Sequence, residues 1–232
     1  MGLGIYLHLV GIDPTLPAFL ASNFNIYNFT RYSVQQLIDL KTQAEEKDKP
    51  YILKVTASQD HNGALSQSGV GIRLLKNQLG DDGNVLFMEA ASAWDIVKCI
   101  QNRIKNGHQP PQIIYIFAHG NTGQIHFSDE VNGSLTKSKL EHYRIKGLLN
   151  YLEKTKTKVV LQACSTGKGN NSIGQSIANQ GVKIIAPQSD INGTESNVGI
   201  QDGQIAIMNL MYQNYDDVKK ATYITPTAYT QD

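Results

Sequence analysis

The sequence predicts an α/β protein in which a mostly parallel β-sheet is sandwiched between helices. From Pro50 onward, short apolar segments alternate with segments of helical periodicity, a pattern typical of strand–helix–strand units. Residues 113–118 and 159–161 are almost continuously apolar, as expected for strands that are buried on both faces of a parallel sheet. Hydrophobic residues make up 41% of the 232-residue chain, so we expect a substantial core.

The expected elements follow one another in a regular order along the chain. Strands are expected at residues 51–56, 85–88, 113–118, 159–161 and 182–186. Helices are expected at residues 66–79, 91–106, 138–152, 171–180 and 203–214. A hairpin is expected between 124–128 and 131–135, because the Asn132-Gly133 pair favours a tight turn. This order places a small hairpin directly after the third strand of the sheet.

Apolar stripes indicate the faces by which two of the helices should pack. In the helix at 91–106 the expected stripe consists of Trp94, Val97, Ile100 and Ile104. In the helix that begins at Ser138 the expected stripe consists of Leu140, Tyr143, Gly147, Leu148, Tyr151 and Leu152. Residues three or four positions apart lie on one side of a helix, so we expect both stripes to be buried.

The chain offers no segment polar enough to serve as a linker between separate domains. Residues 1–50 are expected to form an N-terminal extension that packs on a domain of residues 51–232. Within the extension we expect a strand or hairpin, followed by a helix from Ser33, where the sequence resembles a capping box. The two parts are expected to form one compact unit.

Charge and composition exclude several classes of partner. The 21 basic and 20 acidic residues give a net charge of +1, which provides no electrostatic reason to expect a nucleic-acid partner. The sequence has no run of about 18 apolar residues, so we expect no membrane span. Its start lacks the basic segment of a signal peptide, which favours the cytoplasm or an export route independent of such peptides. Its two cysteines are too few for a disulfide framework.

Polar clusters follow several of the expected strands at their carboxyl ends, where ligands bind in open parallel sheets. The clusters are Asp60-His61-Asn62, His119-Gly120-Asn121, Cys164-Ser165-Thr166-Gly167 and Gln188-Ser189-Asp190. Neighbouring strands lie about 4.8 Å apart, so His119 and Cys164 are expected to approach one substrate atom together.

This arrangement suits nucleophilic catalysis by a thiol. A thiolate is the reactive form of cysteine, and a nearby imidazole such as that of His119 can remove the proton from the Cys164 thiol. The N–H groups of Gly120 and Cys164 are the candidate donors of an oxyanion hole. The helix expected near Asn171 should point its N-terminus toward the Cys164 loop and favour an anion there.

These motifs resemble those of the caspase-like cysteine peptidases. The resemblance rests on Phe117-Ala118-His119-Gly120, on Gln162-Ala163-Cys164-Ser165-Thr166-Gly167, and on the order of elements from about residue 51 to 192. Relatives of this kind include caspases, legumains, gingipains and the cysteine-protease domains of bacterial toxins. The resemblance implies a caspase-hemoglobinase-like fold, a His119–Cys164 dyad, hydrolysis of a protein or peptide substrate, and no metal or other cofactor.

The resemblance also indicates where a substrate side chain would bind. Gln162 matches a residue that lines the specificity pocket in caspases. Residues that follow the strand ends should complete this pocket, namely Asp60, His61, Asn62, Gln188, Ser189 and Asp190. Two carboxylates in such a pocket would disfavour an acidic P1 residue and tolerate a basic or polar one. The sequence departs from caspases after the nucleophile, where Ser165-Thr166 precedes Gly167, and it offers no arginine pair for an aspartate side chain.

Two alternatives remain beside the peptidase. A glycine-rich loop after Cys164 also suggests a cysteine-dependent phosphatase, although the arginine that such an enzyme needs six residues later is Asn170 here. The other alternative is a non-catalytic interaction module that keeps a caspase-like fold.

Overall fold

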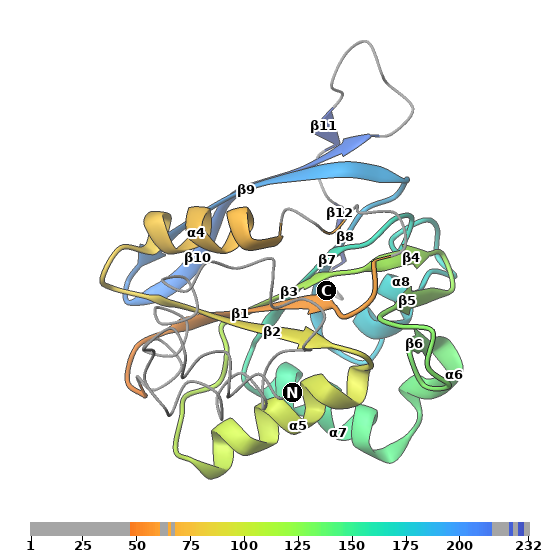
Figure 1. The fold of residues 1–232 in the computed structure, drawn as a ribbon, viewed down its shortest axis with the longest axis horizontal. Helices are drawn as coiled ribbons and strands as arrows, with labels where there is room; N and C mark the ends of the chain where they lie inside the picture. Colours follow the sequence, from red (N-terminus) through yellow and green to blue (C-terminus); the bar gives the residue numbers. More distant parts are fainter. Residues whose placement is uncertain (1–46, 61–64, 66–67, 215–222, 225–226, 230–232) are drawn as a thin grey trace, which may run out of the picture.

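The computed structural model describes residues 47–60, 65, 68–214, 223–224 and 227–229. The predictions for residues 1–46, and for His61 and Asn62, therefore lie outside the described residues. The described chain forms a central sheet with α4 and a long hairpin on one face and α5 and α7 on the other (Figure 1). This arrangement confirms the predicted α/β class and the covering of both faces.

The central sheet has six strands in the order β12-β8-β7-β3-β1-β2. Its strands are β1 (Tyr51–Ala57), β2 (Asn84–Ala90), β3 (Ile113–Phe117), β7 (Lys158–Gln162), β8 (Lys183–Ala186) and β12 (Thr227–Tyr229). The first five are parallel, and β12 pairs antiparallel to β8. All five predicted strands are present, because each contains a short apolar run that the sheet largely buries, although Lys183 at the start of β8 is exposed.

The helices of the described chain pack on the two faces of this sheet. They are α4 (Ser68–Leu79), α5 (Ala93–Lys105), α6 (Lys137–Leu140), α7 (Tyr143–Lys154) and α8 (Ile173–Ala178). One buried cluster joins the central sheet to α5, α7 and α8, and a second joins it to α4 and the β9–β10 hairpin. None of these helices is long and apolar enough to cross a membrane.

Two smaller antiparallel sheets flank the central sheet. One consists of β4 (His119–Asn121), β5 (Gln124–His126) and β6 (Ser134–Thr136), and it contains the predicted hairpin after the third core strand. The other consists of β9 (Ile191–Gln201), β10 (Gln204–Asn214) and β11 (Tyr223–Ile224).

The predicted helix at 203–214 is wrong, because this segment is strand β10. Asp202 and Gly203 both have positive φ angles, of 50° and 72°, and form the tight turn between β9 and β10. A register shift between Ile207 and Asn209 interrupts the alternation of buried residues along β10. The extra residue at this shift, Met208, disrupts the alternation of apolar and polar residues by which a strand is recognised in a sequence.

The buried faces of two helices also differ from the predicted stripes. The helix expected from Ser138 is broken at Glu141-His142, and the new phase after the break leaves Tyr143 68% exposed. The buried residues on this pair of helices are Leu140, Ile145, Leu149 and Leu152. In α5, Ala93 and Ile96 are buried beside Val97 and Ile100, whereas Ile104 near the end of the helix is 45% exposed.

Candidate active site

His119 and Cys164 follow two neighbouring strands of the central sheet. β3 pairs parallel to β7, and the last residue pair in register is Phe117 with Gln162. His119 and Cys164 each lie two residues beyond this pair, and the Ala118 N–H continues the ladder by donating to the Gln162 carbonyl at 3.3 Å. The predicted placement of both residues at the ends of adjacent parallel strands is therefore confirmed, and their facing one cleft stays a prediction.

Gly120 brings the chain after His119 into direct contact with the Cys164 loop. A Cβ atom added at Gly120 would lie 2.8 Å from Cγ2 of Thr166 and 3.0 Å from Cβ of Ala163. A side chain at this position would therefore force Thr166 or Ala163 to move. Asn121 and Gln124 flank a two-residue turn. Such turns close on a hydrogen-bonded pair, and the next pair outward is not hydrogen-bonded, so we expect the Gly120 N–H to point away from β5.

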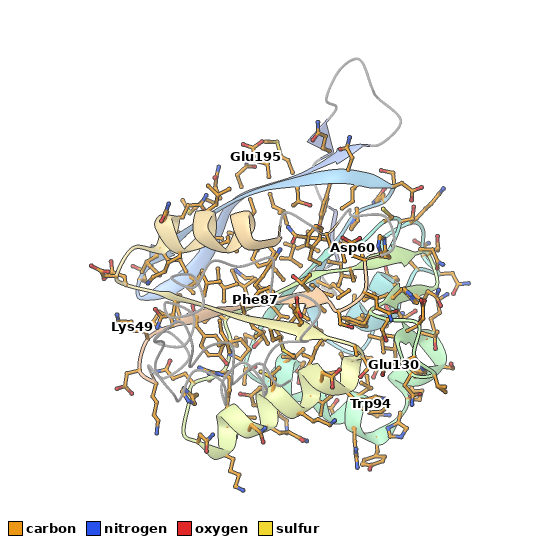
Figure 2. All side chains as sticks on the ribbon, viewed as in Figure 1. Lys49, Asp60, Phe87, Trp94, Glu130 and Glu195 are labelled. Atoms are coloured by element: carbon orange, nitrogen blue, oxygen red, sulfur yellow. The ribbon has the colours of Figure 1, made fainter. Side chains whose placement is uncertain are left out.

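The imidazole of His119 lies beside a buried carboxylate. Its Nε2 atom is 3.4 Å from Oδ1 of Asp60, whose side chain is only 2% exposed. The other carboxylate oxygen of Asp60 accepts a hydrogen bond of 2.9 Å from the Leu65 N–H. Asp60 follows β1 at the carboxyl end of the sheet, where Figure 2 labels it. Sequence reasoning placed Asp60 in a substrate pocket, and the structure places it against His119.

The Cys164 thiol is half-buried and contacts the first residue of β9. The Ile191 N–H donates to the sulfur at 3.4 Å, and the sulfur lies 3.6 Å from the Ile191 carbonyl oxygen, to which it donates. Burial raises the pKa of the Cys164 thiol, the nearby Asp190 carboxylate raises it further, and the Ile191 backbone partly opposes this effect. The resting thiol is therefore protonated at neutral pH, and it needs a base before it can react.

The residue after Cys164 has an unusual backbone conformation. Ser165 has a φ of 54°, which is uncommon for a residue with a side chain. Its N–H donates to the Ser189 carbonyl at 2.9 Å, and its hydroxyl donates to Oδ1 of Asp190 at 2.7 Å. These two bonds fix the turn that carries the thiol away from the end of β7.

Most N–H groups around the Cys164 loop already have backbone partners. Gly167 donates to the Pro187 carbonyl at 2.7 Å, and Thr166 donates to Ala163 at 3.4 Å. At the start of α8, the N–H groups of Ile173 and Gly174 donate to Thr122 and Thr166. The predicted contact between this helix start and the loop is present, but its donors bind backbone carbonyls. They are not directed at an anion beside Cys164.

The remaining predicted pocket residues differ in their surroundings. Gln162 is buried at 8% exposure, and its Oε1 atom accepts a hydrogen bond from Nζ of Lys54. Gln188 and Asp190 are exposed, and Ser189 is partly exposed. Sequence reasoning missed Lys54, although a lysine in the middle of an apolar strand is itself an unusual feature.

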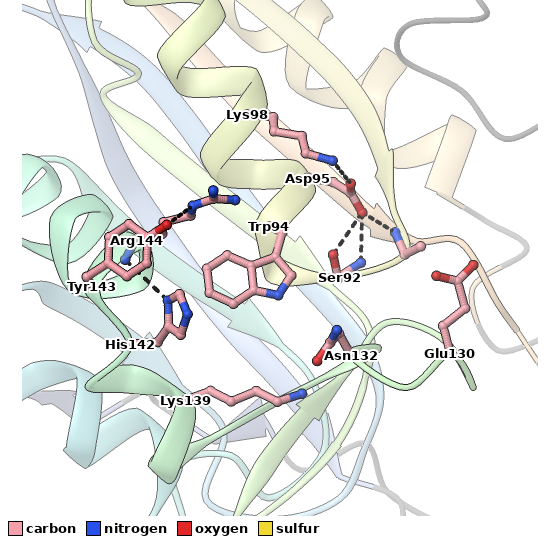
Figure 3. Close-up of a pocket in the computed structure, with 11 residues that line it drawn as sticks. Ser92, Trp94, Asp95, Lys98, Glu130, Asn132, Lys139, His142, Tyr143 and Arg144 are labelled. Carbon is pink, nitrogen blue, oxygen red and sulfur yellow. Dashed lines mark hydrogen bonds and ion pairs between the residues drawn. The ribbon is translucent and has the colours of Figure 1, made fainter.

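A separate pocket of about 700 Å³ lies between the β5–β6 turn and the starts of α5 and α7 (Figure 3). Trp94 and His142 meet edge to face within it, with ring centroids 4.5 Å apart. Its lining contains neither His119 nor Cys164. Across the described residues, no group of three or more His, Cys, Asp or Glu side chains is arranged to hold a metal ion.

Comparison with known families matches part of the chain to a family model. Residues 84–206, just over half of the chain, match the model of a family described as a domain of unknown function (DUF8616). The chain belongs to this family. The match to DUF8616 includes both His119 and Cys164, whereas β1, with Lys54 and the Asp60 that follows it, precedes the matched region. No curated protein matches the chain.

Proposed function

We propose that this chain is a cysteine endopeptidase in which Cys164 is the nucleophile and His119 transfers protons. The observation that carries the proposal is the pairing of β3 with β7, which brings the His119-Gly120 segment against the Cys164 loop. The likeness of both motifs to those of caspase-like peptidases supports the same assignment.

The proposed reaction begins with proton transfer from the Cys164 thiol to His119. The thiolate attacks the carbonyl carbon of the scissile peptide bond, and the carbonyl π electrons move to oxygen. The N–H groups of Gly120 and Cys164 donate to this oxyanion. When the C–N bond breaks, His119 returns its proton to the leaving amine and a thioester remains on Cys164. Water, deprotonated by His119, then hydrolyses the thioester and releases the free thiol.

Asp60 has the position of an orienting group in this scheme. Its carboxylate faces Nε2 of His119, so Nδ1 is the ring nitrogen left to exchange a proton with the thiol. Holding the ring in one tautomer and stabilising the imidazolium would make His119 a better base for a thiol whose pKa is raised.

The hydrogen bonds of the Cys164 loop disfavour the phosphatase alternative. A phosphate cradle requires several loop N–H groups that point at one anion. Here the N–H groups of Ser165, Thr166 and Gly167 all donate to backbone carbonyls. The loop would have to break these bonds before it could bind phosphate through its backbone.

The test combines a fluorogenic peptide library with mass spectrometry after treatment with a peptidyl acyloxymethyl ketone. Cys164→Ala is expected to lower kcat/KM by at least about 1000-fold, whereas Cys99→Ala should leave activity intact because Cys99 lies on α5. The ketone should modify Cys164 and spare Cys99. Turnover of a phosphorylated peptide would indicate the phosphatase, and the absence of both labelling and turnover would indicate a non-catalytic module.

A further inference from the structure

The strand β2 ends the central sheet, yet it is buried along its whole length. The strand order stops at β2, and within the part of the chain that the structure describes its strand partner is β1 alone. All seven of its residues are nonetheless buried, and Val85 and Phe87 are 0% exposed. The inner strand β8 is covered less completely, since Lys183 is exposed and Ile185 is partly exposed. The outer side of β2 is therefore covered as fully as a neighbouring strand would cover it.

The helices on the two faces of the sheet do not explain this cover. Leu86 and Met88 belong to the buried cluster that contains α5, whereas Val85 and Phe87 belong to the cluster that contains α4 and the β9–β10 hairpin. Figure 1 shows α4 and α5 on opposite faces of the sheet at β2. Helices over the faces bury side chains, but the hydrogen-bonding groups of an edge strand lie in the plane of the sheet and point sideways.

The hydrogen bonds at the two ends of β2 show which residues turn their backbone groups outward. The Asn84 N–H donates to the Pro50 carbonyl at 2.9 Å, and the Ser58 N–H donates to the Ala90 carbonyl at 2.9 Å. Both bonds join β2 to the path of β1. Backbone groups of successive strand residues point to opposite edges, so the even-numbered residues of β2 face β1. The residues that face the outer edge are Val85, Phe87 and Glu89.

The backbone groups on this outer edge have partners. Val85 and Phe87 are 0% exposed and Glu89 is 8% exposed, and buried N–H and C=O groups are almost always hydrogen-bonded in native proteins. Each of the three residues takes part in an interaction beyond the pairing of β2 with β1. Valine has no polar or aromatic side chain, so at Val85 this interaction is made by the backbone. Partners at alternate residues are the pattern of a strand ladder.

Among the segments outside the described residues, residues 1–46 can supply such a strand. The segments 61–64, 66–67, 225–226 and 230–232 are shorter than β2. The segment 215–222 joins β10 to β11, and the pairing of Gln213 with Tyr223 holds its two ends together. The strand β12, near the end of the chain, lies at the opposite edge of the central sheet.

Residues 3–9 carry the sequence pattern of a strand within this segment. Leucine or isoleucine stands at every odd position, and the run of seven residues equals the length of β2. Residues 10–46 connect this run to Lys47, shortly before β1, which lies next to β2. Such a connection is much longer than the roughly 23 Å that seven strand residues span, so it permits pairing in either direction. A tethered segment also has a higher effective concentration at this edge than the same segment of a second copy.

We propose that residues 3–9 add a strand to the central sheet by hydrogen-bonding to Val85, Phe87 and Glu89 along the outer edge of β2. The added strand would close an edge that could otherwise pair with other chains. This inference does not depend on the proposed peptidase function, because β2 lies beyond β1 from the strands that lead to His119 and Cys164.

The test is an amide–amide NOESY spectrum of the full chain, deuterated and labelled with ¹⁵N. Amide protons of paired strands are close neighbours, so we expect cross-peaks from Val85, Phe87 and Glu89 to amides within residues 3–9. Cross-peaks from these three amides to a different segment, or none to residues 3–9, would overturn the proposal. A mixture of labelled and unlabelled chains identifies intermolecular cross-peaks. Cross-peaks of that kind would assign the strand to a second copy and would overturn the proposal as well.

A proline variant tests the same ladder by hydrogen exchange. Leu7→Pro removes a donor in the middle of residues 3–9, and Ser22→Pro makes the same change where apolar residues do not alternate. In Leu7→Pro, exchange at Val85 and Phe87 should accelerate at least about tenfold. The amides of Leu86 and Met88, which face β1, should keep their wild-type rates.

The outward and inward amides of β2 control for a general loss of stability. Ser22→Pro should leave the exchange of both sets unchanged. Wild-type rates at Val85 and Phe87 in Leu7→Pro would overturn the proposal, and so would an equal acceleration at Leu86 and Met88. If a proline variant fails to fold, the cross-peaks of the wild-type chain decide.

Discussion

The carboxylate of Asp60 lies 3.4 Å from Nε2 of His119 and is almost completely shielded from solvent. In a thiol peptidase, such a pair stabilises the imidazolium that forms when the cysteine loses its proton. We expect Asp60→Asn to lower kcat by at least about tenfold while the amide oxygen still accepts from the Leu65 N–H. Steady-state kinetics on the peptide library gives the measurement.

Asp190→Asn is the matched control for this prediction. Asp190 also lies near the site, but its carboxylate binds the Ser165 hydroxyl and has no contact with His119 among the described residues. Its replacement should affect kcat much less than Asp60→Asn does. An equal loss of kcat in both variants would show that the Asp60 carboxylate does not specifically orient or stabilise the His119 imidazole.

Gly120 is a position where the fold and the proposed chemistry depend on the same missing side chain. A methyl group there would meet Thr166 and Ala163 at 2.8 and 3.0 Å, and it would push β4 away from the Cys164 loop. We expect Gly120→Ala to lower the free energy of unfolding by about 1–3 kcal/mol and to abolish peptide cleavage. Urea denaturation measures the first effect and the fluorogenic assay the second.

Gly147 provides the opposite case in the same chain. It lies within α7, and an added Cβ would meet no atom within 4 Å. Gly147→Ala should therefore raise the free energy of unfolding by about 0.5–1 kcal/mol and leave the active site unchanged. A destabilised Gly147→Ala, or a Gly120→Ala chain as stable as the wild type, would contradict the packing described here.

The pKa of the Cys164 thiol predicts how its reactivity depends on pH. Because burial and the Asp190 charge raise this pKa, the thiolate fraction at neutral pH is small, and alkylation should accelerate as the pH rises into the alkaline range. Cys99 should react more slowly still, since burial raises its pKa to about 11. Asp190→Asn should move the Cys164 profile toward lower pH by removing a negative charge.

Mass spectrometry after timed exposure to iodoacetamide between pH 6 and pH 10 resolves the two cysteines. A rate for Cys164 that is already constant above pH 6 would mean that the thiolate is preformed. In that case the Cys164 thiolate and a protonated His119 would form an ion pair in the resting protein, and His119 would not be the base that generates the nucleophile.

The core strands could be predicted from the sequence because each one is a short apolar run whose burial does not depend on a particular partner. His119 and Cys164 could be placed for the same reason, since both follow such runs. The strand β10 could not, because the register shift near Ile207 depends on its pairing with β9. The break at His142 was also missed. It depends on the His142 side chain, which caps α7 by accepting a hydrogen bond from the Arg144 N–H, and histidine is not a residue that the sequence pattern marks as a cap.

The polar contacts of the site were predicted less well than its strands. The bond between Lys54 and Gln162 joins residues that are 108 positions apart, and only the strand order brings them together. Asp60 was correctly assigned to the strand ends. Its contact with His119 could not be predicted, because it depends on the path of the chain after β1. Local patterns reveal which residues end a strand, whereas the partner of each depends on the topology.

Lys54 should make the stability of the fold depend on pH in a predictable direction. Burial lowers the pKa of Lys54 from 10.5 to about 7. Below pH 7 the side chain is protonated in both the folded and unfolded states, and the folded state bears the full penalty of a buried charge. Between about pH 7 and 10.5 the folded state has lost the proton and the unfolded state still holds it, so stability rises with pH.

The Lys54→Met variant isolates this effect, because every other titrating group is common to both chains. The free energy of unfolding of the wild type, relative to the variant, should rise by up to about 1.4 kcal/mol per pH unit in this window. Urea denaturation at pH 6, 7.5 and 9 gives the values, and Lys168→Met, at an exposed position, should show no such trend. If the difference between wild type and Lys54→Met stayed constant from pH 6 to pH 9, Lys54 would keep its proton throughout. The contacts with Gln162, Tyr115 and Phe117 would then hold a permanent ammonium ion in the core.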